Sequence, residues 1–273
     1  MIPRLKIVAR SNIVPLMETK ADKTTRIMDF IRDTGTITSP LVLAHISERK
    51  YLLLDDGDIL TAAGRLGIKF LPAQITPPSA AIEVTGRVSA DLNPTLIDEY
   101  ARRWPRDVYT DMPRSDLRKY PAGLQVDLTL PDNGERLILF KGFGPHKLSP
   151  RAIDFFRYLS RRIRFKRYLS PPAYRWGNLK STENGGQLKL LNLEFSDLPI
   201  MARYGWLFPP GLLRFDSGNR IIGINYPVTV LNERAPVREK ERFLRDLLNY
   251  RLECDQSEYI PSGVYLLGDT AKK

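Results

Sequence analysis

Residues 51–75 read YLLLDDGDILTAAGRLGIKFLPAQI, in which two short apolar runs, 51–54 and 70–75, flank an acidic turn and a helical pattern. Brief apolar runs bounded by turn-forming or charged residues are typical of buried strands. The pattern at 61–66 favours a short helix that ends before Gly67. The stretch therefore predicts a strand, a helix and a second strand, with a cluster of acidic residues where the first strand ends.

The residues before this stretch predict two further strands and one helix. Apolar runs at 5–9 and 41–43 favour buried strands. Residues 24–32 place their apolar side chains at helical spacing, and Gly35 is expected just beyond the end of this helix because glycine readily terminates helices. The expected order in the first part of the chain is thus strand, helix, strand, strand, helix, strand.

A proline-rich stretch at 77–79 interrupts this pattern and predicts a domain boundary, which divides the chain into residues 1–78 and 79–273. The second part also contains signals for both kinds of element, so we expect a mixed α/β (α+β) protein. Helices are expected at 94–104, from Ser149 onward, at 198–204 and at 238–251. Strands are expected as a hairpin of 124–130 with 137–140, as a pair of 213–215 with 221–224, and at 188–193 and 263–267.

The composition is that of a folded protein with an excess of positive charge. The 273 residues include 42 Lys and Arg against 31 Asp and Glu, for a net charge of +11. No apolar run approaches the roughly 18–20 residues of a membrane span, and the amino terminus has no secretory-signal pattern, so we expect a cytoplasmic protein outside membranes. With one cysteine, Cys254, and two histidines, a zinc site built from Cys and His is excluded.

The strongest local charge lies between residues 151 and 175, where eight basic residues accompany a single acid. Aromatic residues are interleaved with the basic ones, a composition that suits phosphate contacts and base stacking. A solvated basic helix, or a helix that binds an acidic protein, explains the same composition. The candidate nucleic-acid contacts are Arg157, Arg161, Arg162, Arg164 and Arg167.

Several enzyme classes are excluded because their motifs are missing. The sequence has no Gly-x-x-x-x-Gly-Lys-Ser/Thr phosphate loop, no protein-kinase glycine loop and no Gly-x-Ser-x-Gly nucleophile turn. The acidic cluster Asp55, Asp56 and Asp58 stays a candidate, since carboxylates at a strand end can hold Mg²⁺ beside nucleotide phosphates. The alternative is that these acids form a turn and complement the dipole of the following helix.

The order of these segments resembles the ParB/sulfiredoxin-like fold. More narrowly, it is similar to the free L-serine kinases, among them the archaeal ADP-dependent enzyme and the kinase of staphyloferrin B precursor synthesis. The resemblance implies a ParB/sulfiredoxin-like N-terminal domain that holds the nucleotide and a mixed α/β C-terminal domain that completes the substrate cleft. Residues 85–195 match only loosely. The matching segments are 5–8, Pro15-Leu16-Met17-Glu18, 39–43, Tyr51-Leu52-Leu53-Leu54-Asp55-Asp56-Gly57, 62–67, 71–75, 208–215, 225–228 and 263–267.

The resemblance also implies catalytic and metal-binding roles. In this family a Glu of the first loop accepts the proton of the serine hydroxyl, and Glu18 is the residue at that position. The family's Asp-Gly-x-His-Arg signature binds the nucleotide phosphates and aligns with residues 55–59. Asp55 keeps the first position and is the candidate for catalysis and for Mg²⁺. Asp56 and Asp58 stand at the Gly and His positions, and we assign them to the nucleotide-phosphate site.

Two arginines complete the predicted site. The family's Gly-Val-Thr-Arg segment reads Gly211-Leu212-Leu213-Arg214 here, so the threonine hydroxyl is missing while Arg214 remains. Arg220 follows shortly after. A planar guanidinium can hold a phosphate or a carboxylate through two parallel hydrogen bonds. We therefore expect Arg214 and Arg220 to bind one of these anions.

Two functions from different classes follow. The first is a free amino-acid kinase that transfers a phosphoryl group from ATP or ADP to a hydroxyl of an L-serine-like substrate, with Mg²⁺ as cofactor. The second is a catalytically degenerate member that binds nucleic acid or a protein partner through the basic helix, because the acidic substitutions would repel nucleotide phosphates. The sequence leaves the phosphoryl donor, the acceptor and the oligomeric state open.

Overall fold

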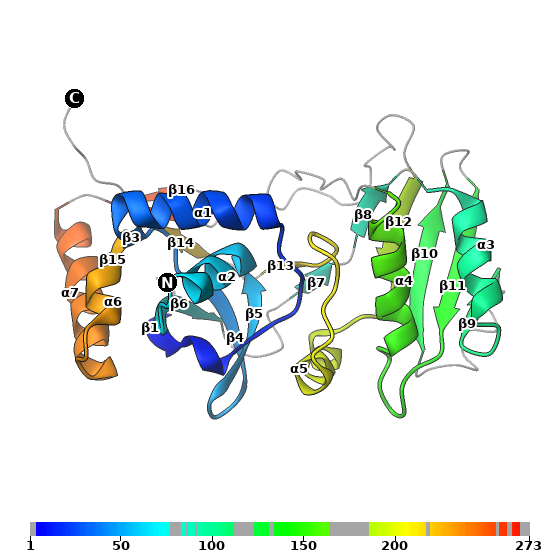
Figure 1. The fold of residues 1–273 in the computed structure, drawn as a ribbon, viewed down its shortest axis with the longest axis horizontal. Helices are drawn as coiled ribbons and strands as arrows, with labels where there is room; N and C mark the ends of the chain where they lie inside the picture. Colours follow the sequence, from blue (N-terminus) through cyan, green and yellow to red (C-terminus); the bar gives the residue numbers. More distant parts are fainter. Residues whose placement is uncertain are drawn as a thin grey trace. The chain divides into compact units, whose positions relative to one another are not determined.

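The structure, a computed structural model, describes residues 4–76, 83–85, 87–90, 92–111, 123–130, 134–163, 186–216, 219–254, 257–260 and 264–267. These residues form helices and strands of a mixed α/β protein, as the sequence predicts (Figure 1). The chain makes two compact units. Unit 1 contains Met1–Pro15, Thr19–Ile82 and Asp216–Lys273, and unit 2 contains Leu16–Glu18 and Glu83–Phe215.

Unit 1 is built on a five-stranded mixed sheet with the strand order β1-β6-β4-β5-β2. The central pair β4 and β6 is parallel, and β1 and β5 flank it in antiparallel orientation. The apolar runs of the sequence supply the middle of this sheet, where neighbours cover both faces. The strands are β1 (Arg4–Ala9), β2 (Ile13–Pro15), β4 (Leu41–Ser47), β5 (Lys50–Asp55) and β6 (Phe70–Thr76).

The helices of unit 1 begin and end at residues with identifiable local reasons. Helix α1 ends at Gly35, whose φ of 64° lies in the left-handed region that glycine adopts without strain. Helix α1 packs against α2, and α7 packs against β1. The helices are α1 (Ala21–Thr34), α2 (Gly57–Arg65), α6 (Val228–Asn232) and α7 (Val237–Glu253), with a 3₁₀ turn η1 (Arg10–Asn12).

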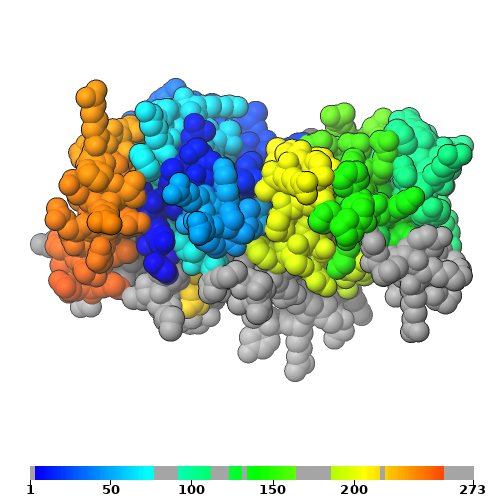
Figure 2. Space-filling view, turned by 90° about the horizontal axis from the view of Figure 1, so that it is seen from below, coloured from blue at the N-terminus to red at the C-terminus, as the bar shows by residue number. Residues whose placement is uncertain are grey.

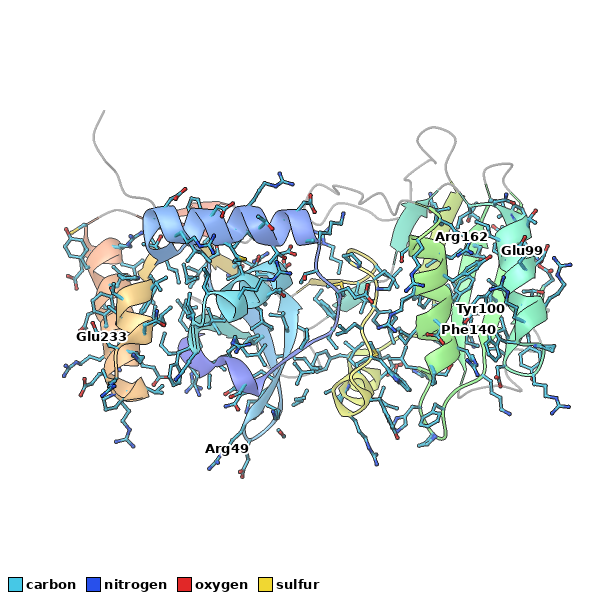
Figure 3. The ribbon with its side chains drawn as sticks, viewed as in Figure 1. Arg49, Glu99, Tyr100, Phe140, Arg162 and Glu233 are labelled. Atoms are coloured by element: carbon cyan, nitrogen blue, oxygen red, sulfur yellow. The ribbon has the colours of Figure 1, made fainter. Side chains whose placement is uncertain are left out.

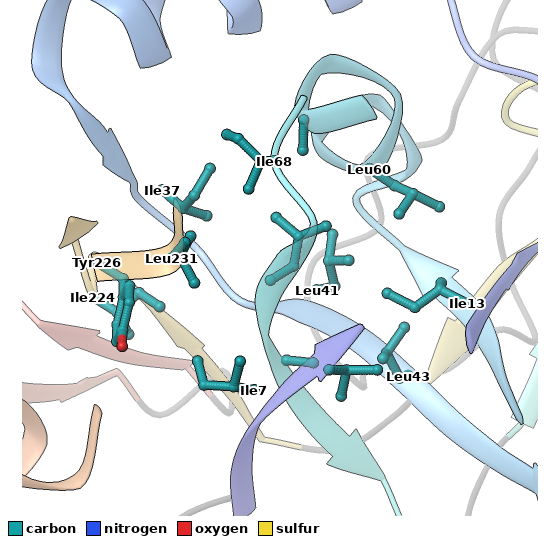
Figure 4. Close-up of a cluster of buried hydrophobic side chains, with 14 of the residues drawn as sticks. Ile7, Ile13, Ile37, Leu41, Leu43, Leu60, Ile68, Ile224, Tyr226 and Leu231 are labelled. Carbon is teal, nitrogen blue, oxygen red and sulfur yellow. The ribbon is translucent and has the colours of Figure 1, made fainter. Parts of the chain in front are cut away.

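The core of unit 1 joins segments from both ends of the chain (Figure 4). Ile7, Leu41 and Leu43 of the sheet pack in one cluster with Ile224 and Tyr226, which lie far along the sequence. A two-stranded sheet also pairs the first part of the chain with the C-terminal segment, and a three-stranded sheet forms within that segment. Their strands are β3 (Thr36–Ile37) with β15 (Tyr226–Pro227), and β14 (Arg220–Ile222), β17 (Val264–Leu267) and β16 (Ser257–Ile260).

The two units therefore differ from the linear division at residue 78 that the sequence suggested. The boundary between residues 82 and 83 is near the expected one, but residues 216–273 belong to the first unit and not to the second. The physical reason is the shared apolar core, because the side chains of the C-terminal segment are buried against the first sheet. A composition break along the chain marks a linker but does not show where a later segment packs.

Unit 2 is built on a five-stranded antiparallel sheet with the order β8-β12-β10-β11-β9. The period-two pattern of 124–130 is borne out, since alternate side chains of β10 are buried. A separate pair joins β7 (Glu83–Thr85) and β13 (Arg214–Asp216). The strands of the large sheet are β8 (Arg87–Ala90), β9 (Val108–Thr110), β10 (Leu124–Thr129), β11 (Glu135–Phe140) and β12 (Gly186–Leu190).

Aromatic residues fill the core of unit 2. Phe155 contacts both Tyr100 and Phe140, with ring centroids 5.1 and 5.0 Å away. Figure 3 labels Tyr100 and Phe140 in this core. Tyr158 of α4 donates a hydrogen bond to Glu99 of α3, and the two helices lie side by side in Figure 2. The helices are α3 (Pro94–Arg103), α4 (Pro150–Ser160) and α5 (Pro199–Tyr204), with a 3₁₀ turn η3 (Phe195–Asp197).

Three local predictions need correction. Helix α2 begins at Gly57, four residues before the expected start, because Asp56 adopts a left-handed conformation and its carbonyl accepts the amide of Ile59 at 2.9 Å. Helix α4 ends at Ser160, and the expected continuation beyond residue 163 lies outside the described residues. The strands near 213–215 and 221–224 exist, but they pair with β7 and β17 instead of with each other.

No helix among the described residues has the length and apolar composition that crossing a membrane requires.

Candidate functional site

The acidic cluster lies where β5 ends and α2 begins, in unit 1. Asp55 is the last residue of β5, Asp56 is the N-cap of α2, and Asp58 is in its first turn. The Asp55 carboxylate accepts the backbone amide of Asp56 at 2.8 Å, which fixes this turn. The amides of Gly57 and Asp58 donate to no other described residue, so the start of α2 keeps two free donors there.

Arg220 bridges the two carboxylates of the turn. Its Nη1 lies 2.6 Å from Oδ2 of Asp55, and its Nη2 lies 2.5 Å from Oδ2 of Asp56. The Nε atom of Arg220 is buried and has no hydrogen-bond partner among the described residues. Burial and the neighbouring Asp55 carboxylate raise the pKa of Asp56 to about 6, against the opposing effects of Arg220 and Lys23. The turn is thus a tight cluster of charges around one guanidinium.

Asp58 is held by the start of α1. Its Oδ1 accepts the backbone amide of Lys20 at 3.3 Å, and its Oδ2 lies 2.7 Å from Nζ of Lys23. The Asp58 side chain is 13% exposed, so this ion pair is shielded from solvent on the carboxylate side. Asp58 therefore joins the first turns of α1 and α2.

The acidic cluster does not fit a metal site made by this chain alone. Among the described residues, no group of three or more His, Cys, Asp or Glu side chains converges as metal ligands would. Asp55 and Asp56 already face Arg220, and Asp58 already faces Lys23. A divalent cation with several carboxylate ligands would have to displace these cations. We therefore assign no metal-dependent step to these residues.

Glu18 belongs to unit 2, on the short segment Leu16–Glu18. Its backbone amide donates to the carbonyl of Phe208 at 2.8 Å, and the amide of Phe208 donates to the carbonyl of Leu16 at 2.9 Å. These bonds fix the segment against Phe208, which is fully buried and packs on Phe156 of α4. The Glu18 carboxylate accepts a hydrogen bond at 2.9 Å from Nε of Arg157, also on α4. The position of this carboxylate is thus set by both backbone and side-chain contacts.

The remaining predicted residues have varied surroundings. Arg214 begins β13 in unit 2 and is exposed, and its side chain makes no hydrogen bond or ion pair with a described residue. Arg161 follows α4 and is exposed, whereas the guanidinium of Arg162 lies 3.9 Å from the centre of the Tyr158 ring. Arg164 and Arg167 lie outside the described residues.

The structure thus brings together Asp55, Asp56 and Arg220. It also pairs Glu18 with Arg157, a residue that the sequence had suggested as a nucleic-acid contact. Arg157 appeared in the sequence as one of many basic residues of a charged helix. Its pairing with Glu18 spans 139 positions, and no local pattern indicates it. Lys23 was also missed, and the only signal was its place in the first turn of a helix.

The chain matches no protein-family model and no curated protein sequence. It does resemble solved structures. SbnI with a C-terminal truncation, from Staphylococcus aureus, has 13% identity and a TM-score of 0.65, over 90% of this chain and 96% of that one. A variant of free serine kinase in complex with AMP has 12% identity and a TM-score of 0.63, over 84% and 94%.

Another complex of the free serine kinase variant, with ADP, has 11% identity and a TM-score of 0.62, over 84% of this chain and 94% of that one. The similarity covers most of each chain, so it extends over both units and is not confined to one motif. At these identities, likeness of structure is evidence of a shared fold, and activity has to be argued from the site. The chain has the fold of SbnI and of free serine kinase.

Proposed function

We propose that this protein is a phosphotransferase that moves a phosphoryl group from ATP or ADP to the hydroxyl of a free, L-serine-like amino acid. The observation that carries the proposal is the fixed carboxylate of Glu18, which combines backbone bonds to Phe208 with an ion pair to Arg157. Support also comes from solved structures of the same fold, which are complexes of free serine kinase with AMP or ADP.

Glu18 has the chemistry that a general base needs. Its Oε1 accepts from Arg157, and its Oε2 makes no hydrogen bond to a described residue, so one oxygen is left to accept a proton. The side chain is 42% exposed, which allows a small hydroxyl compound to reach it. Proton abstraction during phosphoryl transfer raises the nucleophilicity of the hydroxyl oxygen.

The start of α2 supports nucleotide binding in this proposal. The free amides of Gly57 and Asp58, at the positive end of the helix dipole, are donors of the kind that phosphate groups accept from. Asp56 and Asp58 oppose this attraction with their negative charge, and Arg220 and Lys23 offset part of it. The proposal therefore predicts weaker nucleotide binding than a helix start without acids would have.

The test is an incubation of the purified chain with Mg²⁺, with ATP or ADP separately, and with a mixture of free amino acids. Mass spectrometry then detects any phosphorylated amino acid. We expect phosphoserine, or a phosphorylated relative of it, with one of the two donors. Glu18→Gln should lower its rate by about 10²–10⁴-fold, the usual contribution of a general base.

Glu48→Gln is the matched control, because Glu48 is exposed in the turn between β4 and β5 and makes no ion pair with a described residue. It should keep the wild-type rate. Circular dichroism of each variant checks that the fold is retained. Absence of any phosphorylated amino acid with both donors would refute the kinase proposal, and an unchanged rate in Glu18→Gln would remove Glu18 as the base.

A second candidate function, nucleic-acid binding, is favoured by one observation in unit 2. Arg103 of α3 and Arg162 after α4 both lie on the ring of Tyr158, with guanidinium carbons 5.6 and 3.9 Å from its centre. The end of α3 and the residues just after α4 thereby contribute exposed guanidinium groups to one area, in which Figure 3 labels Arg162. Such clusters bind phosphates through electrostatic attraction.

Reversing charge in this area tests the second function. Fluorescence anisotropy with a labelled DNA oligonucleotide at several salt concentrations gives the affinity and its salt dependence. If nucleic acid binds here, the double variant Arg161→Glu with Arg162→Glu weakens binding and flattens the salt dependence. Arg49→Glu, in an exposed turn of unit 1, is the control and should change the salt slope less. Equal slopes in the wild type and the double variant would exclude this area as the contact.

A further inference from the structure

Arg157 holds the Glu18 carboxylate through only one of its three nitrogens. The Nε atom donates to Oε1 of Glu18 at 2.9 Å. Neither Nη atom makes a hydrogen bond to another residue in the described part of the chain. The Arg157 side chain is 31% exposed. Two donors in a planar fork are thus available beside the proposed base, and a carboxylate is the group that matches such a fork.

Arg157 is also fixed in position. It lies on α4, where the neighbouring Phe156 is fully buried and packs on Phe208 with ring centroids 5.8 Å apart. Phe208 in turn hydrogen-bonds the backbone of the Glu18 segment on both sides. The base and the guanidinium therefore belong to one rigid arrangement within unit 2. Preorganised groups of this kind bind a small anion at a low entropic cost.

A carboxylate of the acceptor fits this arrangement, because the acceptor itself carries that anion close to its hydroxyl. An anion on the Nη atoms of Arg157 must lie within a few bond lengths of the hydroxyl that Glu18 contacts. In a hydroxy amino acid such as serine, the carboxylate is attached three bonds from the hydroxyl oxygen.

We propose that Arg157 is a specificity-determining residue that binds the α-carboxylate of the acceptor amino acid while Glu18 accepts the proton of its hydroxyl. This inference rests on the proposed kinase function. In the step, the O–H bond breaks and its proton passes to Oε2 of Glu18. The hydroxyl oxygen forms a bond to phosphorus, and the bond from phosphorus to the donor nucleotide breaks. The nucleotide leaves with one phosphoryl group fewer.

The inference is tested by comparing L-serine with L-serine methyl ester, in which the carboxylate charge is removed. We expect the wild-type protein to prefer serine, as a ratio of kcat/KM values. Arg157→Met should lower kcat/KM for both compounds, because both lose the ion pair that positions Glu18. The decrease should be about 10–100-fold larger for serine than for the ester, since only serine also loses a hydrogen-bonded carboxylate contact. The KM for the nucleotide should not move. Arg157→Lys should recover part of the preference for serine.

Arg106→Met is the control, because Arg106 is an exposed residue of unit 2 without a side-chain contact to a described residue, and it should keep the wild-type preference. If the wild type phosphorylates neither compound, the kinase function itself fails. If the wild type is active and Arg157→Met keeps the preference for serine, only the assignment of Arg157 fails. A higher nucleotide KM with an unchanged preference would also overturn it. If Arg157→Met does not fold, Arg157→Lys replaces it in the test. A wild-type preference for serine over the ester in Arg157→Lys would then overturn the assignment, and a reduced preference would support it.

Discussion

The buried side chain of Gln74 accepts the backbone amide of Ile221 at 3.1 Å, from a position 147 residues earlier in the chain. Its amide nitrogen also donates to the carbonyl of Asn219 at 2.6 Å, and the side chain is 2% exposed. One glutamine thus hydrogen-bonds the backbone on both sides of Arg220, at the start of β14. This contact links the C-terminal segment to β6, an inner strand of the first sheet.

Gln74→Leu should therefore destabilise the protein. The variant keeps the side-chain volume but leaves a buried amide and a carbonyl without partners, at a cost of about 1–3 kcal/mol for each unsatisfied group. Urea unfolding followed by circular dichroism measures the change. Gln125→Leu is the control, since the Gln125 side chain makes no hydrogen bond to a described residue. This substitution should lower the free energy of unfolding by less than about 1 kcal/mol. Equal stability of the wild type and Gln74→Leu would contradict the prediction.

Lys240 stabilises the end of α6. Its side chain is almost fully buried in α7, and Nζ donates to the carbonyls of Val230 at 2.6 Å and Glu233 at 2.8 Å. These carbonyls have no partner further along the short helix, so the ammonium caps the C-terminus of α6 and complements its dipole. Lys240→Met should lower the free energy of unfolding by about 1–3 kcal/mol.

The control for Lys240→Met is Arg245→Met, an exposed position on the same helix. It should change the stability by less than about 0.5 kcal/mol. Thermal unfolding of both variants against the wild type measures the difference. A Lys240→Met variant that melts with the wild type would show that the cap contributes nothing.

The raised pKa of Asp56 predicts how stability depends on pH. Its pKa is about 6 in the folded protein and 3.8 in an ordinary environment, because burial disfavours the charged form. Between these values the folded state binds more protons than the unfolded state, so this residue makes the protein less stable as the pH rises from about 4 to about 6. Asp56→Asn removes the titration, and asparagine tolerates the left-handed conformation at this position.

We expect Asp56→Asn to gain stability relative to the wild type at pH 7, by about 1–2 kcal/mol, and to lose this advantage near pH 4. Chemical unfolding at a series of pH values measures the difference. Asp22→Asn provides a control of the opposite sign, since a backbone hydrogen bond from Lys23 and the Arg26 side chain lower the pKa of Asp22. A difference that does not vary with pH would refute the assignment to Asp56.

Asp58 should weaken nucleotide binding if the proposed function is correct. Asp58→Asn removes a negative charge from the first turn of α2 and releases Lys23 from its ion pair, and both changes favour phosphate. We expect a gain in ATP or ADP affinity of about 3–10-fold, measured by isothermal titration calorimetry. Asp29→Asn, on the exposed face of α1, should leave the affinity unchanged. Equal or weaker binding in Asp58→Asn would mean that the phosphates do not lie at this turn.

Much of the local structure could be predicted because it depends on neighbours in the sequence. Asn93 accepts the amide of Thr95 at 2.9 Å, and Ser149 accepts the amide of Ala152 at 3.4 Å, as their places before helix-starting prolines predict. The hairpin of β10 and β11 follows from alternating residues on both sides of a polar turn. Each of these features is decided by groups within a few residues of one another.

The candidate site could be predicted only in part. The acidic turn was visible because its members are adjacent, and the position of Glu18 was inferred from the order of segments. Arg220 was expected to bind an external anion, yet in the structure it bridges Asp55 and Asp56, which lie 165 and 164 positions earlier. Whether it also contacts phosphate stays a prediction. The competition between internal and external partners for one guanidinium depends on distances that a sequence does not contain.

By itself, the sequence determined the mixed α/β class, most helix and strand positions, the positive charge and the acidic end of β5, because hydrophobic periodicity, capping residues and charge are local properties. Tertiary structure alone decided that the C-terminal segment joins the first sheet and that Arg157 pairs with Glu18. These contacts join residues that are far apart in the chain. They form because each unit buries its own apolar core, and this burial brings distant segments of the same unit together.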